Sequence, residues 1–404
     1  MTVVTLLRRL PRSIWTKTRR KPGHSAAVMT QAVQDASATE AKAKTVVLSV
    51  DAMGGDKGPA TVVAGLARFL TDTPGAKALL HGPEAELAPL VAKRRIGDRV
   101  AIRDARDVVK MTDKPSQVLR SGKETSMWST IDAVKHGEAD VAVSCGNTGA
   151  LMAMSMLQLR KAEGVKRPAI ACLWPSRNPS GFNVMLDVGA DIRAEADDLL
   201  AYAMMGASYA RNGLGLPTPR VGLLNVGTEE HKGRAELKDA QDMIVRAAPA
   251  GAFDYVGFVE GGDLPSDRVD VIVTDGFTGN IALKTGEGTA TLISTLLKEA
   301  FNKTFLSRIA ALLAMTSLLR LRRRIDPRRV NGGVFLGLNK TVIKSHGSAD
   351  ETGVAAALSL AYKLGTSGFS ERVAARIASA VVLAQDSQTE DAENRARAKE
   401  EDPQ

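Results

Sequence analysis

Residues 271–284 read Val-Ile-Val-Thr-Asp-Gly-Phe-Thr-Gly-Asn-Ile-Ala-Leu-Lys, and this stretch decides the fold class. The β-branched run at its start is typical of a buried strand, which Asp275-Gly276 ends. From Ile281 the apolar residues take helical spacing, with Lys284 one turn into the helix. Because a helix N-terminus favours an anion, the stretch predicts a strand, an anion-binding loop and a helix.

Two earlier stretches repeat this order of strand, glycine-containing loop and helix. They are Val46-Val-Leu-Ser-Val-Asp-Ala-Met-Gly-Gly-Asp56 and Ala142-Val-Ser-Cys-Gly-Asn-Thr-Gly-Ala150. A single glycine-rich turn is weak evidence, and ordinary turns between strands and helices are the alternative interpretation. Three such loops together favour a phosphate-handling α/β protein.

From Thr45 short apolar runs alternate with stretches of helical periodicity. The pattern predicts strands at 45–50, 78–81, 99–103, 139–144, 169–173, 183–187, 220–225, 254–259 and 269–274. It predicts helices at 59–71, 84–95, 126–137, 148–160, 195–211, 233–248, 281–300 and 349–365. We expect a three-layer α/β/α fold with a mainly parallel sheet and a small antiparallel element at 330–348. Ligands in such folds bind beyond the carboxyl ends of strands, where all three loops are expected.

Composition excludes several classes of protein. At 404 residues the chain has the average apolar and charged content of a globular protein, and two cysteines argue against a disulfide scaffold or a zinc site. The sequence has no run of eighteen apolar residues, so no transmembrane helix is expected. The net charge of +9 is uneven: residues 1–44 carry +7 and residues 386–404 carry −4. The charge therefore points to basic segments rather than to a nucleic acid partner.

The charge distribution also suggests the domain boundaries. Residues 1–44 read as a basic N-terminal extension that we expect to be disordered. A membrane-surface helix within 3–20, or a true start at Met29, are the alternatives for this segment. Residues 45–385 form the expected α/β domain, and 386–404 form a charged disordered tail.

Residues 301–329 form a basic amphipathic segment within that domain. One interpretation is insertion at an anionic membrane interface, and the other is a packing or dimer-interface helix with a solvated basic end. An acidic protein is a further possible partner of the basic end. The residues expected to make these contacts are Phe305, Ile309, Leu312, Leu313, Arg320, Arg322, Arg323 and Arg324.

Few residues are indicated as catalytic or cofactor-binding by a sequence motif alone. No metal-ligand spacing, dinucleotide fingerprint or Walker A loop occurs, so neither a metal nor a nucleotide cofactor is expected. Cys145 precedes a predicted helix and is a candidate nucleophile, although a small packed residue is the simpler interpretation. His346 follows Lys344 and Ser345 and is a candidate general acid or base, or an anion ligand. A structural histidine is the alternative.

Six blocks in order resemble the signature blocks of the bacterial phosphate acyltransferase family (acyl-ACP:phosphate acyltransferase, PlsX). The resemblance extends from about Thr45 to Leu364. The blocks are Asp51-Ala-Met-Gly-Gly-Asp56, Cys145-Gly-Asn-Thr-Gly-Ala-Leu-Met152, Asp187-Val-Gly-Ala190, Asn225-Val-Gly-Thr-Glu-Glu-His-Lys-Gly233, Thr274-Asp-Gly-Phe-Thr-Gly-Asn-Ile-Ala-Leu-Lys284 and Thr341-Val-Ile-Lys-Ser-His-Gly347.

The resemblance implies a fold like that of phosphotransacetylase and isopropylmalate dehydrogenase. It implies that inorganic phosphate attacks the thioester of a long-chain acyl group on acyl carrier protein, giving acyl phosphate for a membrane glycerol-3-phosphate acyltransferase in phospholipid synthesis. It further implies a cytoplasmic homodimer, peripherally bound to the inner face of the cell membrane, that uses no cofactor. A phosphotransacetylase-like enzyme acting on acyl-CoA and a membrane scaffold of lipid synthesis are the alternatives.

Such a reaction needs donors for phosphate and for the oxyanion close to the thioester carbon. The expected catalytic residues are Asn147, Asn280, Lys284 and His346. The expected phosphate or substrate contacts are Asp51, Gly54, Gly55, Asp56, Gly146, Thr148, Gly149, Asp275, Gly276, Thr278, Gly279, Lys340, Lys344 and Ser345. Direct attack by phosphate is favoured over an acyl-Cys145 intermediate.

Overall fold

The computed structural model describes residues 45–229, 231–318, 320, 332–369 and 372, all within the unit 45–404. The predicted extension at 1–44, the tail at 386–404 and three arginines of the basic segment, Arg322, Arg323 and Arg324, lie outside the described residues.

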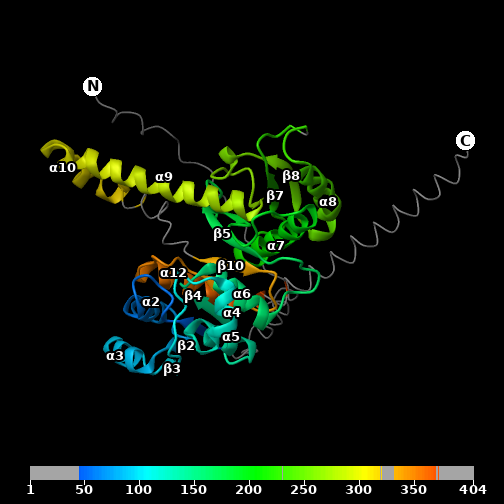
Figure 1. Ribbon diagram of the computed structural model, residues 1–404. Helices are drawn as coiled ribbons and strands as arrows, with labels where there is room; N and C mark the ends of the chain where they lie inside the picture. Colours follow the sequence, from blue (N-terminus) through cyan, green and yellow to red (C-terminus); the bar gives the residue numbers. More distant parts are fainter. Residues whose placement is uncertain (1–44, 230, 319, 321–331, 370–371, 373–404) are drawn as a thin grey trace, which may run out of the picture. The chain divides into compact units, whose positions relative to one another are not determined.

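The described elements alternate between strands and helices, as the sequence predicts (Figure 1). The strands are β1 Val47–Asp51, β2 Lys77–Gly82, β3 Val100–Asp104, β4 Val141–Ser144, β5 Ala169–Pro175, β6 Phe182–Leu186, β7 Arg220–Leu224, β8 Asp254–Val259, β9 Val271–Val273, β10 Gly333–Leu336 and β11 Thr341–Lys344. The α-helices are α2 Pro59–Asp72, α3 Glu84–Arg94, α4 Pro115–Ser121, α5 Ser126–Lys135, α6 Thr148–Leu159, α7 Ala196–Leu214, α8 Ala235–Gly251, α9 Gly276–Asn302, α10 Phe305–Leu313 and α12 Glu351–Thr366. The pattern did not predict α4.

The strands form one mixed sheet in the order β3-β2-β1-β4-β11-β10-β5-β6-β9-β7-β8. Most neighbours are parallel, which confirms the predicted fold class. The antiparallel pairs β11–β10, β10–β5 and β5–β6 lie together in the middle of the sheet. Three reversals in a row leave β6, β9, β7 and β8 running opposite to β1, β4 and β11.

This reversal corrects one expectation. The carboxyl ends of β1, β4 and β11 lie side by side at one end of the strands. The carboxyl end of β9 lies at the opposite end. The three glycine loops therefore do not meet, because the antiparallel pairs in the centre reverse the direction of the strands in one half of the sheet. Only the long helix α9 brings side chains of the third block back toward the first two.

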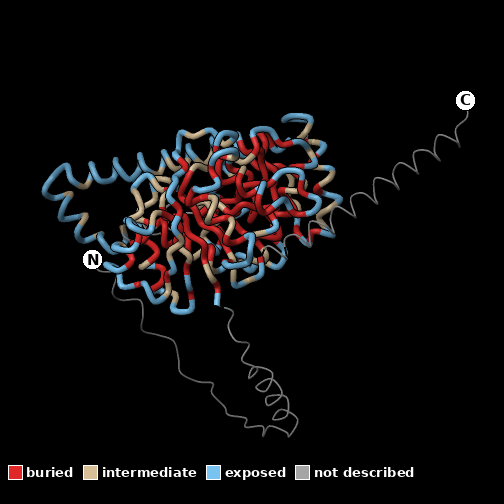
Figure 2. Tube along the Cα trace, turned by 60° about the horizontal axis from the view of Figure 1, so that its bottom comes forward, coloured by how far each residue is buried: buried red, intermediate tan, exposed pale blue. Residues whose placement is uncertain are grey.

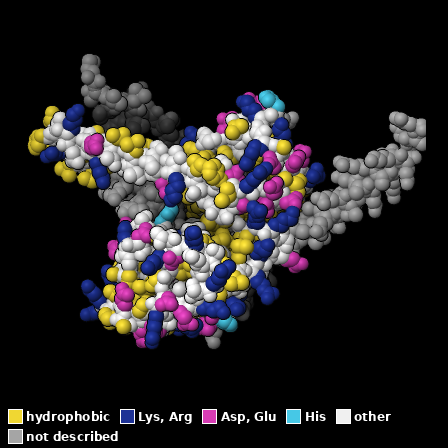
Figure 3. Space-filling model, in the orientation of Figure 1, with side chains coloured by type: hydrophobic (Ala, Val, Ile, Leu, Met, Phe, Trp, Pro, Cys, Tyr) yellow, Lys and Arg dark blue, Asp and Glu magenta, His cyan; other side chains and the backbone are white. Residues whose placement is uncertain are grey.

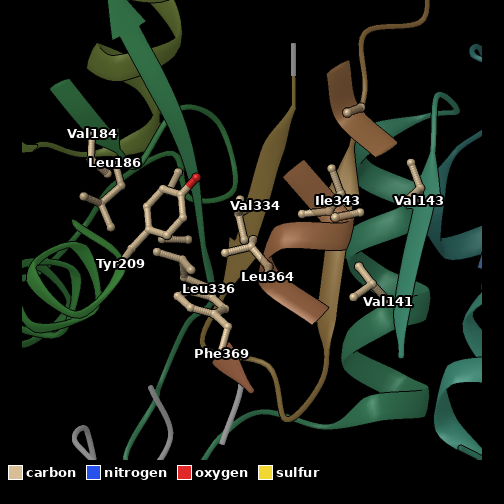
Figure 4. Close-up of a cluster of buried hydrophobic side chains, with 14 of the residues drawn as sticks. Val141, Val143, Val184, Leu186, Tyr209, Val334, Leu336, Ile343, Leu364 and Phe369 are labelled. Carbon is tan, nitrogen blue, oxygen red and sulfur yellow. The ribbon is translucent and has the colours of Figure 1, made fainter. Parts of the chain in front are cut away.

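Helices cover both faces of the sheet. One core packs α2, α3, α7, α8 and α12 on the first face, and a second core packs α4, α5, α6 and the start of α9 on the other. Figure 4 shows the first core: strand residues such as Val334 and Leu336 lie beside Tyr209 of α7 and Leu364 of α12. The Tyr209 ring contacts Phe369 edge to face, with centroids 5.5 Å apart.

The helices α9 and α10 leave these cores. Only Gly276 and Gly279 of α9 are buried, and no residue of α10 is. Figure 2 shows the outer part of α9 as an almost wholly exposed tube. Among the described residues, no helix is both long and apolar enough to cross a membrane.

Candidate active site

A cavity of about 1260 Å³ lies between α9 and the central strands β5, β10 and β11. Its lining is polar where the β11 end meets the first two glycine loops, with Asp56, Gly146, Thr148, Lys344, Ser345 and His346. It is apolar along β5, the loop after β6 and the loop before β9, with Ile170, Cys172, Trp174, Val188, Leu264 and Pro265. The helix α9 contributes Asn280, Lys284 and Glu287.

Backbone contacts join the polar loops to one another. The Asp56 amide donates to the Gly347 carbonyl at 2.8 Å, and the Ser345 amide donates to the Ser144 carbonyl at 2.9 Å. A Cβ on Gly54 would stand 2.6 Å from the Gly146 nitrogen, so only glycine permits this approach. The loops after β1, β4 and β11 thus form one packed floor.

The buried carboxylate of Asp51 holds this floor from beneath. It accepts hydrogen bonds from the hydroxyls of Ser126 and Ser144, each at 2.7 Å, and from the Met53 amide at 3.1 Å. Burial raises the pKa of Asp51, while these donors oppose the shift. Asp51 therefore shapes the loops and does not line the cavity.

The Lys344 ammonium lies at the edge of that floor. It donates to the Cys145 carbonyl at 3.1 Å and to the Ser345 carbonyl. Burial lowers the pKa of Lys344 to about 8, and the carboxylates of Asp51 and Asp56 counteract part of this effect. At neutral pH the group is therefore mostly charged.

Lys284 and His346 approach each other through a third residue. Glu287, one turn after Lys284 on α9, lies 3.0 Å from the Lys284 Nζ and 3.2 Å from the His346 Nε2. The hydrogen bond from His346, together with Lys284, lowers the pKa of Glu287 to about 2. Sequence reasoning missed Glu287; its position three residues after Lys284 on a predicted helix was the available signal.

The two predicted asparagines differ in their surroundings. Asn147 caps α6 by accepting from the Ala150 amide at 3.0 Å, and its amide donates to the carbonyls of Met111 and Asp113, each at 3.0 Å. These bonds give Asn147 a structural role and tie the 110–113 segment over the floor. Asn280 is exposed and lines the cavity.

Four predicted residues of the third glycine block, Asp275, Gly276, Thr278 and Gly279, do not line the cavity. Asp275 caps α9 by accepting from the Thr278 amide at 2.8 Å, and it pairs with Arg234 at 2.6 Å. A Cβ on Gly276 would stand 2.2 Å from the Asp191 carbonyl oxygen. A Cβ on Gly279 would meet the loop after β6 in the same way. These residues pack the start of α9 against its neighbours, at the end of the strands opposite to Lys344.

Of the remaining predicted residues, Gly55 and Gly149 lie at the floor and Lys340 does not. Gly55 lies in the loop after β1, beside Cys145, and Gly149 lies in the first turn of α6, beside Pro115. Lys340 precedes β11, about 13 Å of strand away from Lys344, and does not line the cavity.

The Cys145 thiol is buried beneath the loops. Burial raises its pKa, and a hydrogen bond with Ser345 and the charge of Lys344 only counteract part of the shift. Cys145 itself does not line the cavity. A thiolate nucleophile is therefore disfavoured, in agreement with the prediction that the residue is packed under the loop.

A close contact shapes the apolar end. The Trp174 ring lies so near α9 that a Cβ on Gly286 would stand 2.6 Å from the ring. Trp174, Gly286, Leu264 and Pro265 all line this apolar part of the cavity, which we call the slot. No pattern in the sequence indicated that Trp174 belongs to the site.

The predicted membrane or carrier-protein contacts lie away from the cavity. Phe305, Ile309, Leu312 and Leu313 of α10 are exposed, with Leu313 82% accessible. Figure 3 shows hydrophobic side chains gathered over α10 at the outer end of the helical pair. Arg320 is exposed as well. Among the described residues, no group of three His, Cys, Asp or Glu side chains is placed to hold a metal ion.

Solved structures of two enzymes share the fold. The EutD phosphotransacetylase from Staphylococcus aureus matches with a TM-score of 0.52 and 14% identity, covering 86% of this chain and 98% of its own. A phosphotransacetylase from Streptococcus pyogenes matches with a TM-score of 0.53 and 18% identity, covering 80% and 94%. At these identities the likeness establishes the fold class alone.

Sequence comparisons define the protein class more closely. A phosphate acyltransferase of Paracoccus denitrificans (strain Pd 1222) is 71% identical over 340 residues, 84% of this chain and 92% of the relative. A phosphate acyltransferase of Dinoroseobacter shibae (strain DSM 16493 / NCIMB 14021 / DFL 12) is 72% identical over 335 residues, 83% and 87% of the two chains. The chain is thus an acyltransferase.

A family model described as fatty acid synthesis protein matches residues 46–372. The chain belongs to this family, and the resemblance to phosphate acyltransferases is confirmed.

Proposed function

We propose that this protein transfers a long-chain acyl group from acyl carrier protein to inorganic phosphate, giving acyl phosphate for phospholipid synthesis. The observation that carries the proposal is one cavity whose lining combines Lys344, Lys284 and His346 with an apolar slot. The highly similar relatives, which are phosphate acyltransferases, support the same reaction.

Phosphate binds at the polar end in this proposal. The Lys344 ammonium supplies positive charge beside the floor of loops, and Lys284 approaches from α9 on the other side. The start of α6, with Thr148 facing the cavity, adds the positive end of a helix. Asn280 can donate to a substrate oxygen from the cavity wall.

The acyl chain occupies the slot beside Trp174. Burial of its methylene groups contributes about 0.8 kcal/mol each, which favours long chains over short ones. The thioester then lies where the slot meets the polar end, so that phosphate is held close to the carbonyl carbon.

Phosphate attacks the thioester directly. The buried thiol of Cys145, with its raised pKa, is poorly suited to form an acyl-enzyme. Lys284 or Lys344 stabilises the oxyanion that develops on the carbonyl oxygen. The products are acyl phosphate and the carrier-protein thiol.

The exposed apolar helices extend the proposal to partners. The apolar face of α10 enters an anionic membrane surface, with Arg320 nearby in sequence. The exposed α9 residues Phe277, Ile281 and Leu292 form the contact of a homodimer. The protein then works in the cytoplasm at the inner face of the membrane, next to the membrane glycerol-3-phosphate acyltransferase that consumes its product.

The test is product formation. Purified protein is incubated with palmitoyl-acyl carrier protein, with and without phosphate, and acyl phosphate is trapped as the hydroxamate. We expect phosphate-dependent product that is lost in Lys284→Ala and retained in Cys145→Ala. Turnover of palmitoyl-CoA with indifference to carrier protein would instead support a phosphotransacetylase. Vesicle binding without either reaction would support a scaffold.

A further inference from the structure

Glu287 connects two halves of the sheet across the cavity. It lies on α9, which follows β9, whereas His346 follows β11 in the half that runs the other way. One carboxylate oxygen lies 3.2 Å from the His346 Nε2, and the other lies 3.0 Å from the Lys284 Nζ. A single side chain therefore fixes two groups at the polar end.

The contact with Glu287 also determines the chemistry available to the histidine. A carboxylate that accepts from Nε2 selects the tautomer with its lone pair on Nδ1 and fixes the orientation of the ring. It also stabilises the imidazolium that forms when Nδ1 takes a proton. The Glu287 carboxylate stays ionised, because its donors lower its pKa to about 2.

We propose that Glu287 is a positioning residue that holds His346 for proton transfer from the attacking phosphate to the leaving thiolate. The inference rests on the function proposed above and assigns the proton path within it. Lys284 and Lys344 then stabilise the negative charge of the phosphate and the oxyanion, and His346, held by Glu287, transfers the proton.

The step balances without a further reactant. An oxygen lone pair of hydrogen phosphate forms the bond to the thioester carbon, and the phosphate hydroxyl gives its proton to His346. The carbon–sulfur bond then breaks with its electron pair on sulfur, and His346 returns the proton to give the free thiol. Glu287 gains and loses nothing; it only orients and stabilises the ring.

The test varies the leaving group. A pantetheine thiolate is basic and needs the proton, whereas 4-nitrothiophenolate is a stable anion and leaves without one. Glu287→Gln is assayed with palmitoyl-acyl carrier protein and with the palmitoyl thioester of 4-nitrothiophenol. We expect kcat to fall about 100-fold on the first and to change less than about threefold on the second. The KM for phosphate should change little on either substrate.

Two controls locate the effect. Glu299→Gln makes the same substitution at an exposed site of α9 and should leave both rates unchanged. His346→Ala should reproduce the selectivity of Glu287→Gln, and the double variant should be no slower than His346→Ala alone. Thermal unfolding of each variant identifies any loss of folded protein.

Other outcomes overturn the inference. Equal losses on both thioesters, in folded protein, would mean that Glu287 serves only to hold Lys284 or the cavity wall. Full activity of Glu287→Gln on palmitoyl-acyl carrier protein would remove it from the reaction while leaving phosphate-dependent acyl transfer intact. Absence of acyl phosphate in the wild type would instead refute the proposed function itself.

Discussion

Gly279 lies against the backbone of Asp187 so closely that a Cβ would stand 1.9 Å from the Asp187 carbonyl oxygen. This contact joins the first turn of α9 to the loop after β6. The Asp187 carboxylate is itself held by the amides of Ile170 and Asp191, at 2.8 and 2.7 Å. The direction of α9 over the cavity is therefore determined at the carboxyl ends of β6 and β9, the end of the strands opposite to Lys344.

This contact predicts that Gly279→Ala destabilises the fold. Overpacking at this position should cost at least about 2 kcal/mol of the free energy of unfolding, measured by urea denaturation. The matched control is Gly288→Ala on the same helix, where a Cβ meets nothing within 4 Å. That change should stabilise the protein by about 0.5–1 kcal/mol. If Gly279→Ala kept wild-type stability but bound phosphate more weakly, the loop at 275–279 would be an anion-binding loop and not a packing contact.

The Lys344 pKa predicts how phosphate binding depends on pH. Burial lowers this pKa to about 8, so the group is charged below pH 8 and neutral above it. The KM for phosphate should therefore rise as pH passes 8, by about tenfold for each further unit, since one unit changes the charged fraction tenfold. Lys344→Met should have a high KM that no longer changes between pH 7 and 9. An unchanged wild-type KM across this range would exclude Lys344 as the titrating cation.

The Trp174–Gly286 contact predicts a change in chain-length preference. Gly286→Val should push the Trp174 ring into the slot and shorten the space for the acyl chain. We expect kcat/KM for palmitoyl-acyl carrier protein to fall about tenfold more than that for the octanoyl substrate. Gly288→Val, where the added side chain meets open space, is the control. Equal losses for both substrates would show that the chain lies elsewhere.

The exposed face of α10 predicts membrane binding that can be separated from catalysis. Replacing Leu312 and Leu313 with Glu removes two apolar side chains that are 69% and 82% exposed. Binding to phosphatidylglycerol vesicles, measured by co-sedimentation, should fall about 100-fold, while acyl transfer in solution is retained. Val245→Glu places one such charge on an exposed residue of α8 and should have no effect. Undiminished vesicle binding of the double variant would direct attention away from α10.

The sequence predicted the fold because local patterns report strands and helices well. The spacing of apolar residues at 46–56 and 142–150 indicated buried strands followed by tight loops, and the floor of the site contains both. Lys344, Ser345 and His346, which the sequence offered as candidates, line the cavity beside this floor. These features depend on residues close to one another along the chain.

What the sequence did not show depends on sheet direction. Three successive antiparallel pairs in the centre of the sheet, β11–β10, β10–β5 and β5–β6, reverse the direction of β9, and nothing local to 271–284 indicates that reversal. Glycines at Gly276 and Gly279 looked like an anion loop, although close packing requires them. Glu287 and Trp174 join the site only because α9 crosses β5, a contact that no periodicity encodes.

The most direct test of the account is thiol release before phosphate is added. Wild-type protein is mixed rapidly with palmitoyl-acyl carrier protein in phosphate-free buffer, and free carrier-protein thiol is followed against enzyme concentration. The account predicts no release until phosphate is supplied, and then thiol and acyl phosphate in equal amounts. A burst of thiol equal to the enzyme concentration without phosphate, abolished in Cys145→Ala, would contradict direct attack and establish an acyl-enzyme.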